Sequence, residues 1–124
     1  MGLIVTKVKG TITATAIATA DDLIVNPSSY DSITGSIIFY NTDSSARNVY
    51  VAVVNLSGGQ QGTPAATDVI WSSSLAAVTS PGENWDVFDI SQALTGDNDT
   101  LVAYASATAV VNYAGCYAKI PDQS

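Results

Sequence analysis

The chain has 124 residues, long enough to bury roughly two thirds of its unfolded surface in one domain without disulfides or metals. Its 4 basic and 11 acidic side chains give a formal net charge of -7. This charge repels phosphate backbones and anionic lipid, so neither nucleic acid nor a membrane is an expected partner. The chain has no histidine and a single cysteine, Cys116, which excludes an internal disulfide, a cysteine-based zinc site and a Ser-His-Asp triad.

Turn-forming residues divide the chain into short segments, and no segment has the apolar spacing of a long helix. The residues expected in strands are 3–9, 11–20, 23–25, two strands within 33–56, and then 69–78, 83–90, 100–106 and 110–120. Within residues 10–120 these are seven strands, or eight with the short one at 23–25, and they predict an all-β fold, an antiparallel β-sandwich. The strand count favours a jelly roll, and an immunoglobulin-like topology is the alternative.

The N-terminal residues include an apolar, β-prone run, Leu3, Ile4 and Val5. Gly10 is expected to separate this run from the strand that follows. We therefore expect residues 1–9 to form an N-terminal strand or arm, residues 10–120 a single β-sandwich domain, and residues 121–124 a frayed tail. Because an uncovered apolar strand is an aggregation hazard, residues 2–8 are expected to pair with an edge of their own sheet or of a neighbouring subunit's sheet.

Residues 33–56 are expected to form a β-hairpin around the polar turn 41–45, since short polar side chains favour turns. Both alternating sets of side chains in this hairpin are mostly apolar, whereas a strand with one wet face alternates cleanly. Both faces are therefore expected to be covered, one of them by a partner. The residues predicted at this interface, besides Leu3, Ile4 and Val5, are Ile38, Tyr40, Tyr50, Ala52 and Val54.

Candidate chemical sites are few. The turn at Asp97 and Asp99 offers oxygen ligands for calcium but lacks the rest of a helix-loop-helix calcium site, so a solvated turn is the expected state. Trp71 and Trp85 could form a platform for a ligand such as a glycan, but Trp85 and its carboxylate neighbour Asp86 point to opposite faces of one strand. Cys116, in an alternating run, is expected to be buried. No catalytic residue, metal or cofactor is predicted.

Four stretches form a pattern: TATAIATA, SIIFYNTDSSARNVYVAVVNLSGG, SLAAVTSPGENWDVFDI and LTGDNDTLVAYASAT. Taken together, over about residues 10–120, they resemble a family of small bacteriophage virion structural proteins. The matching positions are Ile38, Tyr40, Asn41, Arg47, Val49, Val51, Ser57, Gly58, Gly59, Leu75, Ala76, Ala77, Pro81, Gly82, Glu83, Leu94, Gly96, Asp97 and Leu101. The sequence departs from the family pattern in a longer segment at 21–32 and a bulkier strand at 85–88.

The resemblance implies a non-enzymatic structural protein of the virion. Together with the doubly apolar hairpin, it leads us to expect a capsid decoration or cement protein that acts as a symmetric homo-oligomer, with a trimer favoured. Its expected partners are the phage major capsid protein or tail proteins. The alternative is a tail or fibre module that binds host surface glycans, and an enzyme acting on polysaccharide is a third possibility.

Overall fold

The computed structural model describes residues 4–25, 30–55, 65–90 and 99–121, and these residues form an all-β sandwich. Strands and short 3-10 helices follow one another as β1 Ile4–Thr11, η1 Ile17–Thr19, β2 Asp21–Val25, β3 Tyr30–Asn41, β4 Arg47–Asn55, η3 Ala66–Asp68, β5 Val69–Leu75, β6 Trp85–Asp89, β7 Asp99–Ala105 and β8 Val111–Pro121. The predicted fold class, an antiparallel sandwich of short strands, is confirmed.

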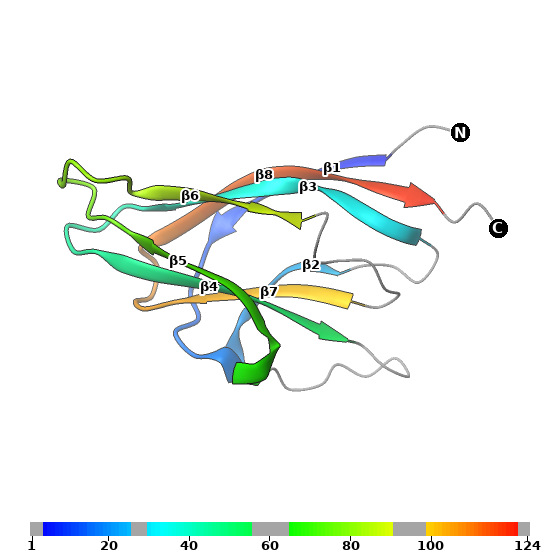
Figure 1. Ribbon diagram of the computed structural model, residues 1–124, viewed down its shortest axis with the longest axis horizontal. Coiled ribbons are helices and arrows are strands. Elements are labelled where there is room, and N and C mark those ends of the chain that lie inside the picture. Colours follow the sequence, from blue (N-terminus) through cyan, green and yellow to red (C-terminus); the bar gives the residue numbers. More distant parts are fainter. Residues whose placement is uncertain (1–3, 26–29, 56–64, 91–98, 122–124) are drawn as a thin grey trace.

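The strands form two four-stranded antiparallel sheets that face one another (Figure 1). Sheet A has the order β1-β8-β3-β6, and sheet B has the order β2-β7-β4-β5. Apart from β4 and β5, which are neighbours in sheet B, successive strands alternate between the sheets in the manner of the two Greek keys of a jelly roll. Of the two topologies considered, the strand order is that of the jelly roll.

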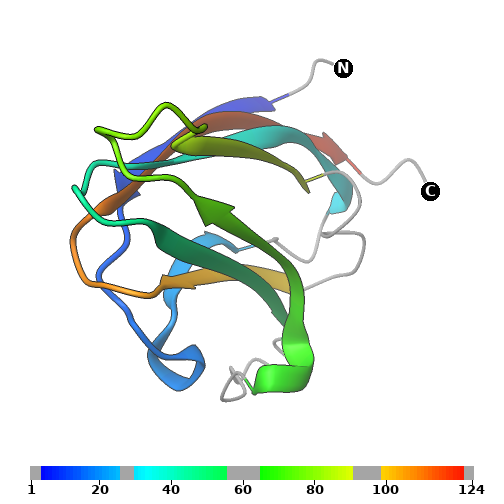
Figure 2. The same cartoon turned by 60° about the vertical axis from the view of Figure 1, so that its left-hand side comes forward.

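The predicted hairpin at 33–56 is wrong, although its two strands exist. β3 pairs with β6 and β8 in sheet A, whereas β4 pairs with β5 and β7 in sheet B. The turn between them therefore crosses from one sheet to the other at one end of the sandwich (Figure 2). Alternation and turn residues look the same in a hairpin and in an inter-sheet arch, so the local pattern could not distinguish them.

The predicted strand at 11–20 is also wrong. β1 runs through Gly10 without a break and pairs with β8 of its own sheet from Ile4 to Thr11. After it, Ile12 donates its amide to Val111 of sheet A, and Ala14 accepts the amide of Ala105 of sheet B. This segment connects the two sheets, so its backbone groups are satisfied without a strand ladder.

A single apolar core lies between the sheets. The largest fully buried side chains of the described residues come from both sheets and from the segments between strands: Phe39, Ile12, Ile37, Leu75, Ile90, Leu101, Val49, Val51, Val102 and Val111. Most of them join one cluster, while Ala52, Val54 and Val102 form a second cluster on the other face of sheet B. Ile17, Ala20 and Val69 pack against this second cluster, so the chain itself covers that face of β4.

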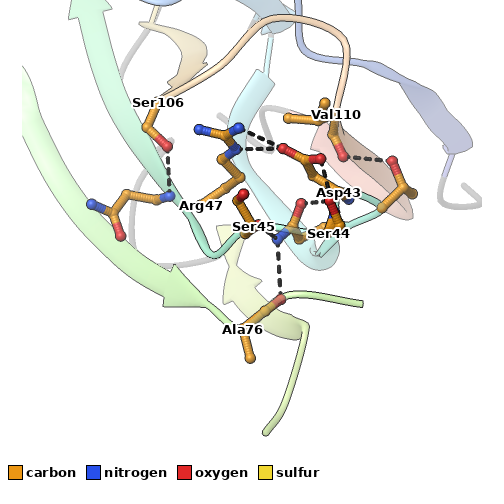
Figure 3. A network of polar contacts seen from close by, with 10 residues as sticks. Asp43, Ser44, Ser45, Arg47, Ala76, Ser106 and Val110 are labelled. Atoms are coloured by element: carbon orange, nitrogen blue, oxygen red, sulfur yellow. Dashed lines mark hydrogen bonds and ion pairs between the residues drawn. The ribbon is translucent and has the colours of Figure 1, made fainter. Parts of the chain in front are cut away.

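The arch between β3 and β4 is held by the fully buried Asn41. Its side-chain amide donates to the carbonyls of Ser45 (2.9 Å) and Ala76 (3.0 Å), and its Oδ1 accepts the amide of Asp43 (2.9 Å). Arg47 donates from Nε to Asp43 Oδ2 at 2.7 Å and forms an ion pair with the same carboxylate (Figure 3). One side chain thus fixes the arch to the segment after β5.

Asn41→Ala is expected to lower the free energy of unfolding by about 3 kcal/mol, because the carbonyls of Ser45 and Ala76 and the Asp43 amide lose their partner. Urea denaturation should show a lower midpoint with an unchanged slope. Ser44→Ala, at an exposed position of the same arch, is the control and should stay within about 0.5 kcal/mol of the parent. A loss no larger than that in Asn41→Ala would show that the arch does not depend on this side chain.

The hydrogen bond from Arg47 holds the pKa of Asp43 below its ordinary value of 3.8. A carboxyl whose pKa is lower in the folded state stabilises the fold above its unfolded pKa, and this contribution is lost as the pH falls through the folded pKa. The stability advantage of the parent over Asp43→Asn should therefore be constant near neutral pH and shrink below about pH 4. Arg47→Gln should remove the same pH dependence, and parallel curves for parent and Asp43→Asn down to pH 3 would contradict the assignment.

Candidate interaction surface

The outer face of sheet A is uncovered by the described residues, and the strand register defines its layout. In antiparallel sheets, directly paired residues place their side chains on the same face. The outward residues therefore form four cross-strand rows: Thr11, Asn112, Tyr40 and Trp85; Lys9, Ala114, Ile38 and Val87; Lys7, Cys116, Ser36 and Asp89; Val5, Ala118 and Thr34. The complementary set, which includes Phe39 and Phe88, lies in the core.

One corner of this face is apolar. Trp85 and Val87 of β6 are each 45% exposed, and their cross-strand neighbours Tyr40 and Ile38 of β3 are half-buried. We call these four residues the apolar corner. Large apolar side chains gathered on the outside of a sheet are typical of a surface that meets another protein.

The opposite margin of the same face is basic. Lys7 and Lys9 point outward from the edge strand β1 and are both exposed. Cys116 lies beside Lys7 and is exposed, so its predicted burial is wrong. Alternate side chains of β8 point into the core, and these are Val111, Tyr113 and Tyr117. Cys116 belongs to the other set, which points outward.

The residues predicted at one interface lie on two opposite faces of the sandwich. Ile38 and Tyr40 are on the outer face of sheet A, whereas Tyr50, Ala52 and Val54 are on the outer face of sheet B. Ala52 and Val54 are already buried. The error in pairing β3 with β4 also made these residues look contiguous.

Two tyrosines occupy the outer face of sheet B. The rings of Tyr50 and Tyr104 stack with centroids 4.6 Å apart and an interplanar angle of 12°. Burial, and secondarily the neighbouring Tyr50, raises the pKa of Tyr104. This face therefore has its aromatic side chains paired with one another.

The N-terminal residues predicted at the interface are placed only in part. Leu3 lies outside the described residues, and for Ile4 the backbone is described, paired with Lys119. Val5 is 66% exposed on the outer face of sheet A. Of the two pairings considered for this strand, the structure shows the one with its own sheet.

The structure does not bring Trp71 and Trp85 together. The ring of Trp71 packs against Phe39 (centroids 5.7 Å apart) and Phe88 (5.4 Å), at the margin of the core. Trp85 lies on the opposite side of sheet A, and Asp86 points inward, where it accepts a hydrogen bond from Ser73 at 2.7 Å. A shared aromatic platform does not form.

The remaining candidate sites give little chemistry. Of the two carboxylates considered for calcium, Asp97 lies outside the described residues, and Asp99 begins β7, where it pairs with Asn55. Within the described part of the chain, no group of three or more His, Cys, Asp or Glu side chains could hold a metal ion. The same residues include no helix that is long and apolar enough to cross a membrane.

No protein-family model matches the chain, and no curated protein matches it. Among solved structures it is similar to a protein of Bacillus endospore appendages, described as disulfide-linked pili, with 19% identity and a TM-score of 0.46 over 98% of this chain and 91% of that chain. It is also similar to chains from infectious bursal disease virus: one of the Gx strain (11% identity, TM-score 0.41) and one of a VP2 subviral particle (12%, 0.36). These cover 98% and 96% of this chain and 33% of each viral chain. Similarity at this level carries no functional weight for the chain.

The two tryptophans are expected to respond differently to solvent. In Trp71→Phe only Trp85 remains, and in Trp85→Phe only Trp71 remains, so each variant reports one site. Acrylamide should quench the fluorescence of Trp71→Phe more strongly, because Trp85 is exposed and Trp71 packs against Phe39 and Phe88. Equal quenching constants in two folded variants would show that Trp85 is covered.

Proposed function

We propose that the chain is a non-enzymatic structural protein of a bacteriophage virion, where it decorates or cements the capsid as a symmetric homo-oligomer. We expect it to form a trimer and to bind the major capsid protein. The motif resemblance of residues 10–120 supports the setting. The observation that carries the proposal is the apolar corner, which offers Trp85 and Val87 to a partner from a rigid sheet.

Two of the matched motif positions, Asn41 and Arg47, stabilise the arch between β3 and β4. Asn41 ties the arch to the segment after β5, and Arg47 holds Asp43 in place. Neither side chain lies on the outer face of sheet A. These two side chains stabilise the fold, whereas the apolar corner would contact a partner. Separate residues for folding and for assembly are expected in a structural protein.

A second candidate function is glycan binding by a tail or fibre module. The exposure of Trp85 favours it, because an exposed indole ring can stack on a sugar. Since Trp71 packs at the margin of the core, such a site would use Trp85 with its cross-strand neighbour Tyr40. A glycan array probed with the parent and with folded Trp85→Ala tests it. Hits that disappear in the variant support glycan binding, and an array without hits removes it.

Native mass spectrometry of the parent at micromolar concentration should show a symmetric oligomer. When the protein is added to capsids that lack it, the two should co-sediment. Val87→Ser should weaken one or both associations at least tenfold, because it removes half-exposed apolar surface from the corner. Ile70→Ser is the matched control, since Ile70 is 51% exposed on β5 in the other sheet. A parent that is monomeric and does not bind capsids would overturn the proposal.

A further inference from the structure

We propose that the outer face of sheet A forms a two-fold contact between two copies of this chain, with β1 of each copy lying over β6 of the other. The contact deepens the proposed function, because it assigns the apolar corner to a second copy, but it involves this chain alone and holds whether or not the protein decorates a capsid.

The two central strands of the face differ in the size of their outward side chains. β3 presents Tyr40 and Ile38, whereas β8 presents the smaller Asn112 and Ala114 in the paired positions. A two-fold axis parallel to the strands and between β3 and β8 turns β3 of each copy onto β8 of the other. Ile38 then meets Ala114 of the second copy, so that large side chains fill the space left by small ones, as close packing requires.

The same axis makes the charges complementary. Lys7 and Asp89 lie in one cross-strand row, at the β1 and β6 margins of the face. The axis preserves the row and exchanges the margins, so Lys7 of each copy lies over Asp89 of the other. Lys9 likewise meets Val87 of the second copy, and its aliphatic stem can pack there while its ammonium group reaches toward Trp85.

An axis perpendicular to the strands gives a less favourable contact. It would place β1 over β1 and bring the lysines of two copies together, with the apolar corners facing one another at the other margin. Like charges juxtaposed at an interface are repulsive. Charge therefore selects the axis parallel to the strands.

The size of the face indicates a weak contact. Four strands about 4.8 Å apart and the seven residues from Val5 to Thr11 cover about 19 Å by 24 Å, or roughly 900 Å² over two copies. Specific stable interfaces begin somewhat above this size. We therefore expect a dimer that dissociates on dilution and weakens with salt, and that gains strength from repetition in an assembly.

Sedimentation velocity over a concentration series tests the charge pairing. Lys7→Glu should weaken the dimer at least tenfold, and Lys7→Glu with Asp89→Lys should return it to within about threefold of the parent. Within one copy these residues are three strand spacings apart, about 14 Å, beyond the screening length at physiological salt. Rescue therefore reports a contact between copies.

A matched pair of variants separates specific contact from net charge. Asp89→Lys alone should weaken the dimer although it makes the acidic chain less repulsive to a second copy. Glu83→Lys makes the same charge change at an exposed site outside the face and should leave the dimer unchanged or strengthen it. If both variants strengthen the dimer alike, net charge alone governs association and the proposed contact is wrong.

Cys116 supplies a probe that needs no substitution, because it is exposed near the centre of the face. Sheets packed face to face lie about 10 Å apart, so a short bis-maleimide should link two copies through Cys116 in the parent and much less in Lys7→Glu. A parent that stays monomeric at high concentration, or a dimer without this cross-link and without charge-swap rescue, would overturn the contact. An intact dimer that fails to bind capsids would count against the virion assignment alone.

Discussion

The fold depends on the passage of the chain from sheet A to sheet B between β3 and β4. An arch at the end of a sandwich leaves backbone groups that no strand ladder satisfies, and Asn41 satisfies three of them with one buried side chain. A buried amide is tolerated only when its donors and acceptor are used. With the arch fixed, β3 is paired on both sides in sheet A and β4 on both sides in sheet B, which makes both strands rigid.

The crossing of the chain between β3 and β4 also determines which faces of the two sheets are exposed. Each sheet has one face on the core, so each outer face needs a separate cover. The chain covers part of sheet B itself, with Ile17 and Ala20 over Ala52 and Val54, whereas the outer face of sheet A keeps Trp85 and Val87 exposed. The sandwich is therefore asymmetric, and one of its two broad faces is suited to a partner.

The sequence predicts the strands well because alternation and turn residues are local signals. The predicted strand at 83–90 contains β6, the one at 100–106 is shifted from β7 by one residue, and the short strand at 23–25 lies within β2. Strand pairing is a long-range property, so the polar turn at 41–45 could not reveal that β3 and β4 belong to different sheets. The same limit applies to the candidate surface. Alternation places Lys7, Cys116 and Val87 on one face of their own strands, but only the register shows that the strands share that face.

Because the chain is acidic, the position of Lys7 and Lys9 affects where a second copy can approach. Two copies that each carry a formal charge of -7 repel one another in most orientations, and the repulsion is felt over about one screening length. Lys7 and Lys9 locally offset this charge on the outer face of sheet A. Because the apolar corner lies on the same face, the surface with the most to gain from burial is also the one where a second acidic copy is least repelled.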